Sequence, residues 1–329
     1  MDLRQLGNFL HAAELQNLSR AATALRVAQP ALSRQIKALE EELGVQLLQR
    51  RGWGVTPTPA GRVLMEHARR VLKEVGAARD AVLAYQEEPS GNVTFGTPTS
   101  LGTVMLPGLA VRFRRAAPKV RLHLVEGFSA SIHEWVQSGR LDLAVLYETR
   151  TMGSLATVPL LEESMALLGP AGRFAAGTGM DVAEVARLDL LLPARPHRLR
   201  LLVDQALAER GLDCAPVVEV DALPALVELV RMGEGCTLLP YSCVHALVRD
   251  GGLSAAAVHP AIRRSLVLAR PPDRVPTPAS QALEREVLAF IRAQAAPLRW
   301  TIPGAAPDPS PDPSLDPDAG APGAGATAA

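Results

Sequence analysis

The sequence contains few cysteines and no hydrophobic run long enough to cross a membrane. Its three cysteines, Cys214, Cys236 and Cys243, form neither a Cys-X-X-Cys pair nor a cysteine–histidine spacing that suits a metal. We therefore expect buried free thiols rather than a disulfide framework or a metal site. No apolar run reaches the roughly 18 residues of a transmembrane helix. Because Arg4 interrupts the first residues, no signal peptide is expected, and the chain is predicted to be cytoplasmic, with no membrane partner.

Net charge and catalytic motifs are also missing. The chain has 34 basic and 34 acidic residues, so any binding to nucleic acid must depend on local charge. Only three of the basic residues are lysines, and the planar fork of arginine suits phosphates and guanine edges better than an ammonium does. The motifs Gly-X-Ser-X-Gly and His-Glu-X-X-His are absent. We expect no catalytic residues, no cofactor and no enzymatic activity.

The first 58 residues are predicted to be helical with short turns. The 329-residue chain is long enough for two or three domains. Leu32, Ile36 and Leu39 recur at helical spacing behind Pro30, which suits the first turn of a helix. Ser19 can cap the helix before it. Residues 45–58 alternate around a Gly-Trp-Gly tip, which indicates a short hairpin.

The polar face of this third helix fits a major groove. A helix that presents small residues, a hydroxyl and a forked cation near its N-terminus can approach base edges closely. Pro30, Ser33, Arg34 and Lys37 lie on or beside that face, whereas the acidic run 40–42 lies at the other end. The hairpin adds Arg50 and Arg51, which suit phosphate or minor-groove contacts. An ordinary solvated helix face is the alternative explanation.

A heptad pattern follows the hairpin. Apolar residues recur at alternating gaps of four and three, behind a helix start at Thr58-Pro59. The residues of this pattern are Leu64, Ala68, Val71, Val75, Ala78, Val82 and Tyr85. A seam along one helix of roughly 40 Å needs a partner helix. We expect dimerisation through it, with packing on its own domain as the alternative.

From residue 92 onward, short apolar runs alternate with helical stretches, which predicts an α/β domain with parallel sheets and a cleft between two lobes. In such sheets, ligands bind beyond the carboxyl ends of strands. The first two predicted strands are followed by hydroxyl-bearing residues, namely Thr97, Thr99, Ser100 and Ser129. Hydroxyls and free N–H groups at helix starts can bind an anion. As plain helix caps they need no ligand.

The segments "AQPALSRQI" and "LEEELGVQLLQR", together with "TPTPAG", occur in an order that resembles the N-terminal domain of LysR-type transcriptional regulators. Within the family, the resemblance is strongest to nitrogen-assimilation-control and cyanate-regulator-like members, and it continues weakly to about residue 300. Leu48 departs from it, since the family often has Phe there. The resemblance implies base and phosphate contacts by Gln29, Pro30, Ser33 and Arg34, and hairpin contacts by Arg50 and Arg51.

The resemblance also implies an effector domain like a periplasmic binding protein, which holds a small and often anionic metabolite between its lobes. Ser100 and Ser129 match positions that contact such ligands in several family members. The second lobe would contribute residues from "LPARPH", and Tyr147 would form part of the cleft wall or of the packing behind it. The second-lobe candidates are Arg195, Pro196 and His197.

The resulting prediction is an α/β protein with an all-α winged helix-turn-helix domain at residues 1–58. A linker helix at 59–89 and a two-lobed effector domain at 90–300 follow, with lobe I at about 90–161 and 268–300 and lobe II at about 162–267. Residues 301–329 are rich in Pro, Ala, Gly and Asp and are predicted to be a disordered acidic tail.

The predicted function is sequence-specific binding of promoter DNA, controlled by a small, anionic effector. We expect a homodimer or homotetramer, and the resemblance allows contact with RNA polymerase. A ligand-independent regulator of the same family is one alternative. A small-molecule binding protein or an enzyme with a helical N-terminal domain is the other.

Overall fold

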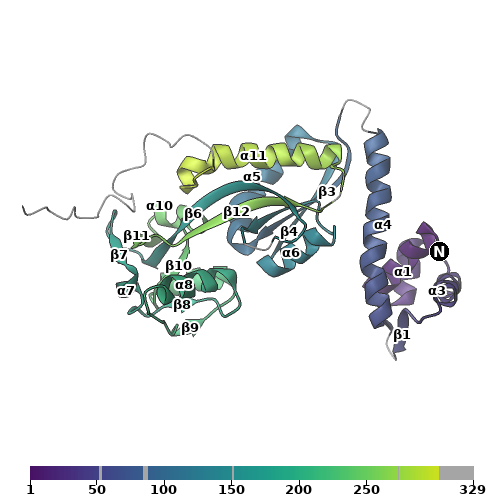
Figure 1. Cartoon of the computed structure of the whole chain (residues 1–329), viewed down its shortest axis with the longest axis horizontal. Coiled ribbons are helices and arrows are strands. Elements are labelled where there is room, and N and C mark those ends of the chain that lie inside the picture. The colour runs from purple at the N-terminus through teal and green to yellow at the C-terminus, as the bar shows by residue number, and fades with distance from the viewer. Residues whose placement is uncertain (52–53, 84–87, 150–151, 273, 304–329) are drawn as a thin grey trace, which may run out of the picture.

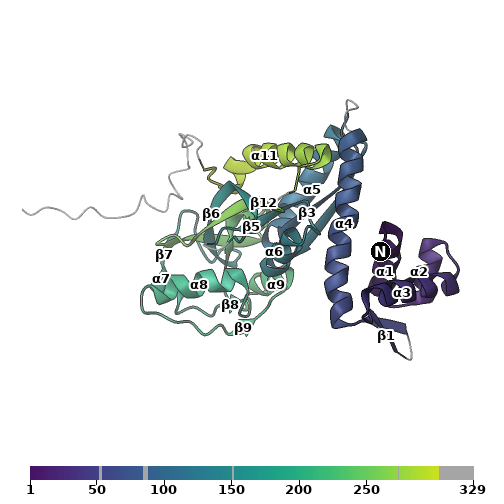
Figure 2. The same ribbon diagram turned by 45° about the vertical axis from the view of Figure 1, so that its right-hand side comes forward.

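The computed structural model describes residues 1–51, 54–83, 88–149, 152–272 and 274–303. A small helical domain lies at one end, and a two-lobed α/β domain lies at the other (Figure 1). The long helix α4 (Pro59–Leu83) stands between them in both ribbon views (Figures 1 and 2). None of the described helices is both long and apolar enough to span a membrane.

Three helices and a hairpin form the N-terminal domain. The helices are α1 (Leu3–Leu15), α2 (Leu18–Leu25) and α3 (Gln29–Leu43), and the hairpin pairs β1 (Leu48–Arg51) with β2 (Gly54–Pro57). Phe9, Leu32 and Leu39 are fully buried in the core that the three helices share. The cap of α2 differs from the prediction, because the side chain of Asn17, not Ser19, accepts the hydrogen bond from a free N–H of the first turn.

Lobe I is a sheet covered by helices on both faces. Strands β3 (Gly91–Pro98), β4 (Val120–Gly127) and β5 (Leu143–Tyr147) run parallel, with α5 (Thr99–Ala116) after β3 and α6 (Ser129–Gln137) after β4. Every residue of β5 is buried, because Leu143 and Val145 face the core of α5 and α11 (Pro278–Leu298) while Ala144 and Leu146 face α6.

One long strand, β6, connects the lobes. The first part of β6 (Ala156–Pro170) pairs with β12 (Arg263–Arg270) in lobe I, and its second part pairs with β11 (Leu253–His259) and β10 (Thr237–Pro240) in lobe II. These pairings are antiparallel, so the sheet is mixed rather than wholly parallel as the sequence predicted. The difference arises because β12 returns beside the first part of β6, and β10 and β11 return beside its second part.

Lobe II contains the remaining short elements. They are β7 (Gly179–Asp181), α7 (Val182–Val185), β8 (Leu191–Leu192), α8 (Arg198–Ala208), β9 (Val218–Glu219), α9 (Leu223–Met232), the 3-10 turn η1 (Tyr241–Cys243) and α10 (His245–Arg249). After α11 the chain returns to the crossing region, where Thr301 pairs with Glu162 of β6. Thr301 and Ile302, assigned to the tail from the sequence, thus belong to the fold, whereas residues 304–329 lie outside the described residues.

Candidate functional site

Helix α3 buries one face and exposes the other, as its spacing requires. Leu32, Ile36 and Leu39 are buried against α1 and α2. The residues predicted to contact DNA lie at or near the N-terminal half of the helix. Gln29, Pro30, Arg34 and Lys37 are exposed, and Ser33 is half-buried. Lys37 pairs with Glu41 at 3.4 Å on this solvated surface, which leaves the guanidinium of Arg34 as the forked donor at the front of α3.

The hairpin is held against α3 and α4 by backbone contacts. The carboxylate of Glu40 accepts hydrogen bonds from the N–H groups of Leu47 and Leu48, at 2.8 and 3.0 Å. At Gly61 of α4, an added Cβ would lie 2.0 Å from the carbonyl oxygen of Leu47, so only glycine allows the helix to approach this closely. Arg50 and Arg51 belong to β1, but their side chains lie outside the described part of the chain.

The heptad residues of α4 divide into two groups. Leu64 packs against the N-terminal domain, and Ala68, one turn further along the helix, is fully buried. The remaining described residues are exposed and lie further along the helix, namely Val71, Val75, Ala78 and Val82. Val82 has 73% of its surface exposed. The side chain of Tyr85 lies outside the described residues. The start of the seam is thus buried, and the residues from Val71 onward are not buried by any described part of the chain.

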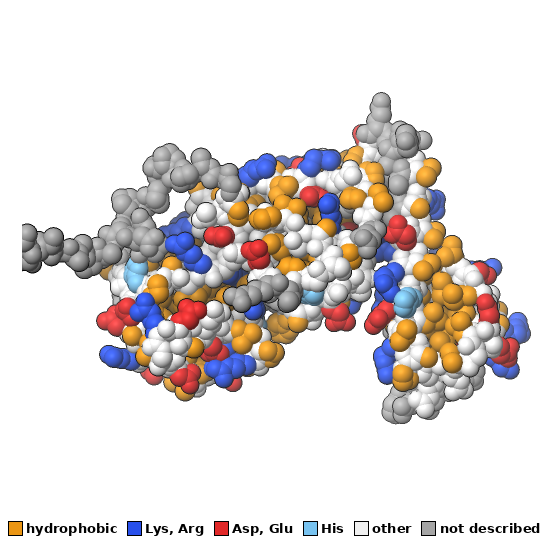
Figure 3. All heavy atoms as spheres, viewed as in Figure 1, with side chains coloured by type: hydrophobic (Ala, Val, Ile, Leu, Met, Phe, Trp, Pro, Cys, Tyr) orange, Lys and Arg blue, Asp and Glu red, His pale blue; other side chains and the backbone are white. Residues whose placement is uncertain are grey.

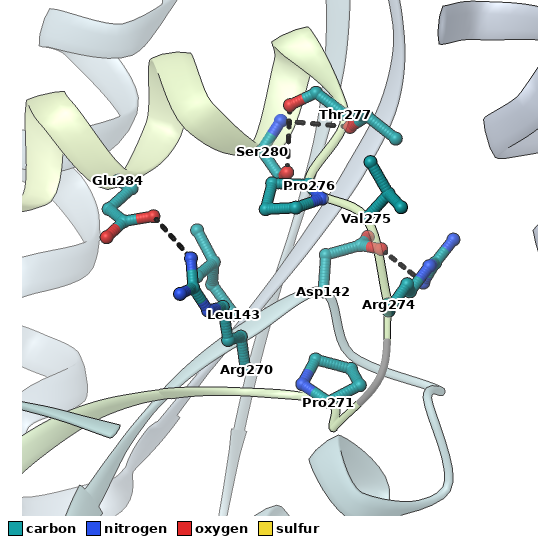
Figure 4. Close-up of a pocket in the computed structure, with 10 residues that line it drawn as sticks. All are labelled: Asp142, Leu143, Arg270, Pro271, Arg274, Val275, Pro276, Thr277, Ser280 and Glu284. Atoms are coloured by element: carbon teal, nitrogen blue, oxygen red, sulfur yellow. Dashed lines mark hydrogen bonds and ion pairs between the residues drawn. The ribbon is translucent and has the colours of Figure 1, made fainter. Parts of the chain in front are cut away.

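Ion pairs attach α4 to lobe I, and we call Lys73, Asp142 and Arg274 the α4 clamp. The ammonium of Lys73 lies 3.0 Å from the carboxylate of Asp142, and it donates to the Thr94 hydroxyl at 3.2 Å. Arg274 reaches the same carboxylate at 2.8 Å (Figure 4) and lies 3.4 Å from Glu74 of α4. Burial lowers the pKa of Lys73, and the charge of Asp142 opposes this effect. The Lys73–Asp142 pair is therefore partly desolvated, which distinguishes it from a solvated surface contact.

A buried polar network joins the two lobes. Arg264 and Glu163 face each other across β12 and β6, with 1% and 2% of their side chains exposed. Glu163 also accepts hydrogen bonds from Ser242 and from the indole of Trp300, the latter at 3.0 Å. On the other side, Arg264 donates to the hydroxyls of Ser100, at 2.7 Å, and of Tyr147. We call these six residues the hinge network.

Charge and burial in the hinge network act in opposite directions. Burial disfavours a charged guanidinium at Arg264, but Glu163, Tyr147 and Cys243 together outweigh it, so the pKa of Arg264 is raised. Burial raises the pKa of Tyr147, which therefore keeps its hydroxyl proton. The thiol of Cys243 donates to the backbone carbonyl of Ser100 at 2.8 Å, which adds another contact between lobes. The six residues of the hinge network hydrogen-bond to one another, and these bonds hold Ser100 and Tyr147 in place.

An open cavity of about 380 Å³ lies beside the hinge network, and we call it the effector cavity. Its lining residues are Tyr147, Glu148, Thr149, Arg198, Leu202, Arg263, Arg264 and Ser265. Tyr147 ends a strand of lobe I, whereas Arg198 and Leu202 belong to α8 of lobe II, so the cavity lies between the lobes. Three guanidinium groups against one carboxylate in the lining favour a negatively charged occupant. Elsewhere on the view of Figure 3, basic and acidic side chains are interspersed over both lobes.

Most residues predicted for the effector do not belong to the lining of this cavity. Tyr147 lines it. Thr97 is fully buried, whereas Ser100, at 2% exposure, lies behind the lining with its hydroxyl bonded to Tyr147 and Arg264. Thr99 and Ser129 are the first residues of α5 and α6 and are half-buried.

The predicted second-lobe residues lie just before α8. Arg195 is exposed, and its guanidinium binds Asp204 of α8 at 2.7 Å, while Pro196 is exposed beside it. His197 caps α8 by accepting a hydrogen bond from the N–H of Leu199, and its ring meets the ring of Phe128 edge-on at 5.7 Å. Since Phe128 directly precedes α6, this contact joins the lobes.

The environment keeps His197 neutral. Burial lowers its pKa below the ordinary 6.5, the charge of Arg264 lowers it further, and Asp221 partly offsets both. A neutral ring is also what the cap requires, because Nδ1 accepts a hydrogen bond and so carries no proton.

Sequence reasoning missed Glu163, Arg264 and Arg198. Glu163 and Arg264 belong to the apolar segments "LLEESMALL" and "RRSLVLAR". An acid in one predicted strand and a base in another is the signal that could have indicated a buried ion pair between them. Arg198 follows directly on the predicted "LPARPH" but carried no separate signal. Among the described residues, no group of three or more acidic, histidine or cysteine side chains could hold a metal.

Two family models match the chain. Residues 3–62 match the bacterial regulatory helix-turn-helix protein of the lysR family, and residues 86–292 match the LysR substrate binding domain. The nitrogen assimilation regulatory protein nac of Klebsiella aerogenes is 32% identical over 293 residues, which cover 88% of this chain and 95% of that protein. The DNA-binding transcriptional dual regulator OxyR of Escherichia coli is 32% identical over 273 residues, covering 82% and 88%.

Solved structures show the same fold. A full-length OxyR variant from Pseudomonas aeruginosa is 26% identical, with a TM-score of 0.71, and the match covers 89% of this chain and 95% of that one. Full-length CbnR in complex with its target DNA is 24% identical, with a TM-score of 0.65, covering 88% and 100%. The relatives named here are transcriptional regulators, so the expectation that the chain is not an enzyme is confirmed.

Proposed function

The chain belongs to the LysR family of bacterial transcriptional regulators, and we propose that a small, negatively charged metabolite bound between its lobes controls its binding to promoter DNA. The observation that carries this proposal is the effector cavity, whose lining includes Arg198, Arg263 and Arg264 and has walls from both lobes. A ligand that contacts both walls favours the arrangement in which they approach, and so shifts the population of lobe arrangements. A regulator of this kind would act in the cytoplasm, and contact with RNA polymerase stays a prediction.

For DNA binding, we propose that α3 enters the major groove with Gln29, Pro30, Ser33 and Arg34 foremost. Exposure of Gln29, Pro30 and Arg34, together with the buried opposite face of the helix, supports this assignment. Lys37 would contact phosphate. Arg50 and Arg51 keep their proposed role in the hairpin on the strength of the family resemblance alone.

We propose a homodimer, or a tetramer built from such dimers, that pairs through the exposed part of α4. Val71, Val75 and Val82 support it, because an exposed apolar row on a 25-residue helix is stabilised when a second helix covers it. Leu64 and Ala68 would support the seam only indirectly, by fixing the helix to the N-terminal domain.

Several relatives are named hydrogen peroxide-inducible activators, which makes a thiol sensor the second function to consider. The thiols of this chain argue against it. Burial raises the pKa of Cys214 and Cys236, and it raises that of Cys243 to about 12. Because the thiolate is the reactive species, these cysteines are poor targets for peroxide. An anionic metabolite is therefore the better effector.

A gel-shift series on DNA fragments from the promoter beside this protein's own gene tests the proposed DNA binding. Replacing Arg34 with Ala should weaken specific binding by about 1–3 kcal/mol, roughly 5- to 150-fold, and relax the preference for the operator. Replacing Lys37 with Ala should weaken specific and random duplex alike and reduce the salt slope by about 1. Arg195→Gln, on lobe II, is the matched control. Unchanged operator affinity of Arg34→Ala at equal salt would remove Arg34 from the contact set.

A further inference from the structure

Glu40 joins the two parts of the N-terminal domain that the proposed function places on DNA. It lies in the second half of α3 and is half-buried. Its Oε1 atom accepts hydrogen bonds from the N–H groups of Leu47 and Leu48, at 2.8 and 3.0 Å, where the first hairpin strand begins. Its backbone carbonyl accepts from the N–H groups of Gly44 and Val45. One residue thus fixes the end of the helix, the turn after it and the start of the hairpin.

The backbone groups that the Glu40 carboxylate binds lie in a buried part of the chain. Leu47 is 1% exposed and Leu48 is 8% exposed. A buried N–H that loses its acceptor is costly, because water cannot reach it to replace the lost bond. Removing Oε1 therefore favours a movement of this segment that brings the two N–H groups to water or to another acceptor. Such a movement displaces the start of the hairpin relative to α3.

Contacts from α1 and α4 hold the rest of the hairpin. The N–H of Val55 in β2 donates to the carbonyl of Gln16, which caps α1, at 2.9 Å. The N–H of Thr58, directly before α4, donates to the carbonyl of Leu47 at 2.9 Å. These bonds attach the hairpin to the body of the domain, and Glu40 links it to the helix that we propose enters the major groove.

The neighbouring acids of the run 40–42 have different partners. Glu41 pairs with Lys37 at 3.4 Å on the exposed face of α3, and Glu42 pairs with the N-terminal ammonium of Met1. A carboxylate on a DNA-binding domain is repelled by phosphates, so the charge of Glu40 cannot favour binding. The property of Glu40 that can favour it is the acceptor atom Oε1.

We propose that Glu40 is a positioning residue for DNA binding, which fixes the hairpin at the angle to α3 at which both contact one duplex. This inference rests on the proposed DNA binding and adds a residue that itself touches no DNA. A hairpin that is already held in place need not be ordered when the duplex binds, so its contacts add to those of α3. Without Oε1, the contacts of α3 remain and those of the hairpin are lost.

The test measures the binding of the full chain to operator and random duplex in gel shifts over a range of salt concentrations. Glu40→Ala should bind the operator about tenfold or more weakly. The slope of log affinity against log salt should fall by about 2, because the two phosphate contacts proposed for the hairpin are lost. Glu40→Gln can keep an oxygen at the position of Oε1 and loses the charge, so it should bind at least as tightly as the parent, with the same slope. Glu41→Ala is the matched control, and it should bind at least as tightly as the parent, without a lower slope.

A hydroxyl-radical footprint separates positioning from a general loss of fold. Glu40→Ala should lose protection of the backbone at the flanks of each half-site, where the hairpin lies, and keep it over α3. Uniform weakening at all positions with the slope of the parent would overturn the proposal, as would unchanged operator affinity. An equal loss in Glu40→Gln and Glu40→Ala would also overturn it.

Two further outcomes are covered. If Glu40→Ala is unfolded by circular dichroism, Glu40→Asp takes its place with the same expected and contradicting results, because its carboxylate is one methylene shorter and keeps the charge. A parent protein without preference for the operator would refute the proposed DNA binding and this inference with it. Normal binding by the parent with no effect of the Glu40 variants would refute the inference alone.

Discussion

Replacing Glu163 with Gln tests the hinge network most directly. The glutamine has nearly the same shape but no charge, so Arg264 is left buried at 1% side-chain exposure without its counter-ion. The new amide NH₂ group also faces donors, because the described partners of the carboxylate oxygens are the donors Arg264, Ser242 and Trp300. Breaking one side of a buried ion pair costs about 3–5 kcal/mol. For a domain of this size, each kcal/mol lowers the unfolding temperature by about 2–4 °C, so the expected decrease is about 6–20 °C.

Calorimetry of the full chain is the assay, with the transition of the effector domain assigned separately from that of the N-terminal domain, because two domains need not unfold together. Glu219→Gln is the matched control. Glu219 also binds an arginine, Arg200, but its side chain is 50% exposed, and such pairs contribute about 1 kcal/mol or less. Adding Arg264→Met to Glu163→Gln should recover part of the loss, since the unpaired charge is then gone. A loss in Glu163→Gln no larger than in the control would refute the reasoning.

Three further predictions follow from other parts of the fold. Gly61→Ala should destabilise the N-terminal domain by about 1–3 kcal/mol in thermal unfolding, because its Cβ would meet a carbonyl oxygen at 2.0 Å, whereas Gly7→Ala, with open space around it, should gain about 0.5–1 kcal/mol. Val75→Glu should yield monomers in light scattering while Met232→Glu, an exposed site elsewhere, does not; dimers of both would contradict the seam. Burial lowers the pKa of His197, so the unfolded chain binds more protons than the folded protein as the pH falls below 6.5, and the stability of the parent protein decreases. Between pH 6.5 and 5, the urea midpoint of His197→Gln should therefore fall less than that of the parent protein.

The sequence was sufficient where local periodicity decides structure. The spacing of Leu32, Ile36 and Leu39 predicted α3 and its buried face, and the apolar runs predicted most strands. It failed for β11, where "LSAAAVH" has the low strand propensity of alanine and is held in place by β6 on one side and β7 on the other. Such pairing is a tertiary effect that no short window contains.

The candidate site was predictable only as a region. Tyr147 lines the effector cavity, and Ser100 lies directly behind it, because both come at the carboxyl ends of strands, which topology brings to one edge. The sequence did not predict which arginine lines the cavity, because this depends on which arginines form ion pairs with acids in the fold. Arg195 is bound to Asp204, while Arg198, three residues later, is not. Arg195 lies in the segment before α8 and Arg198 is the first residue of the helix, so two arginines that are close in sequence have different surroundings that composition cannot separate.

The α4 clamp has a mechanical consequence. Since Lys73, Asp142 and Arg274 join the long helix to lobe I, we expect the helix and that lobe to move together. Lobe II would then be the part that moves relative to the N-terminal domain. If a ligand displaces lobe II, as we propose, the displacement would be transmitted to α4 through β6 and the contacts around Trp300.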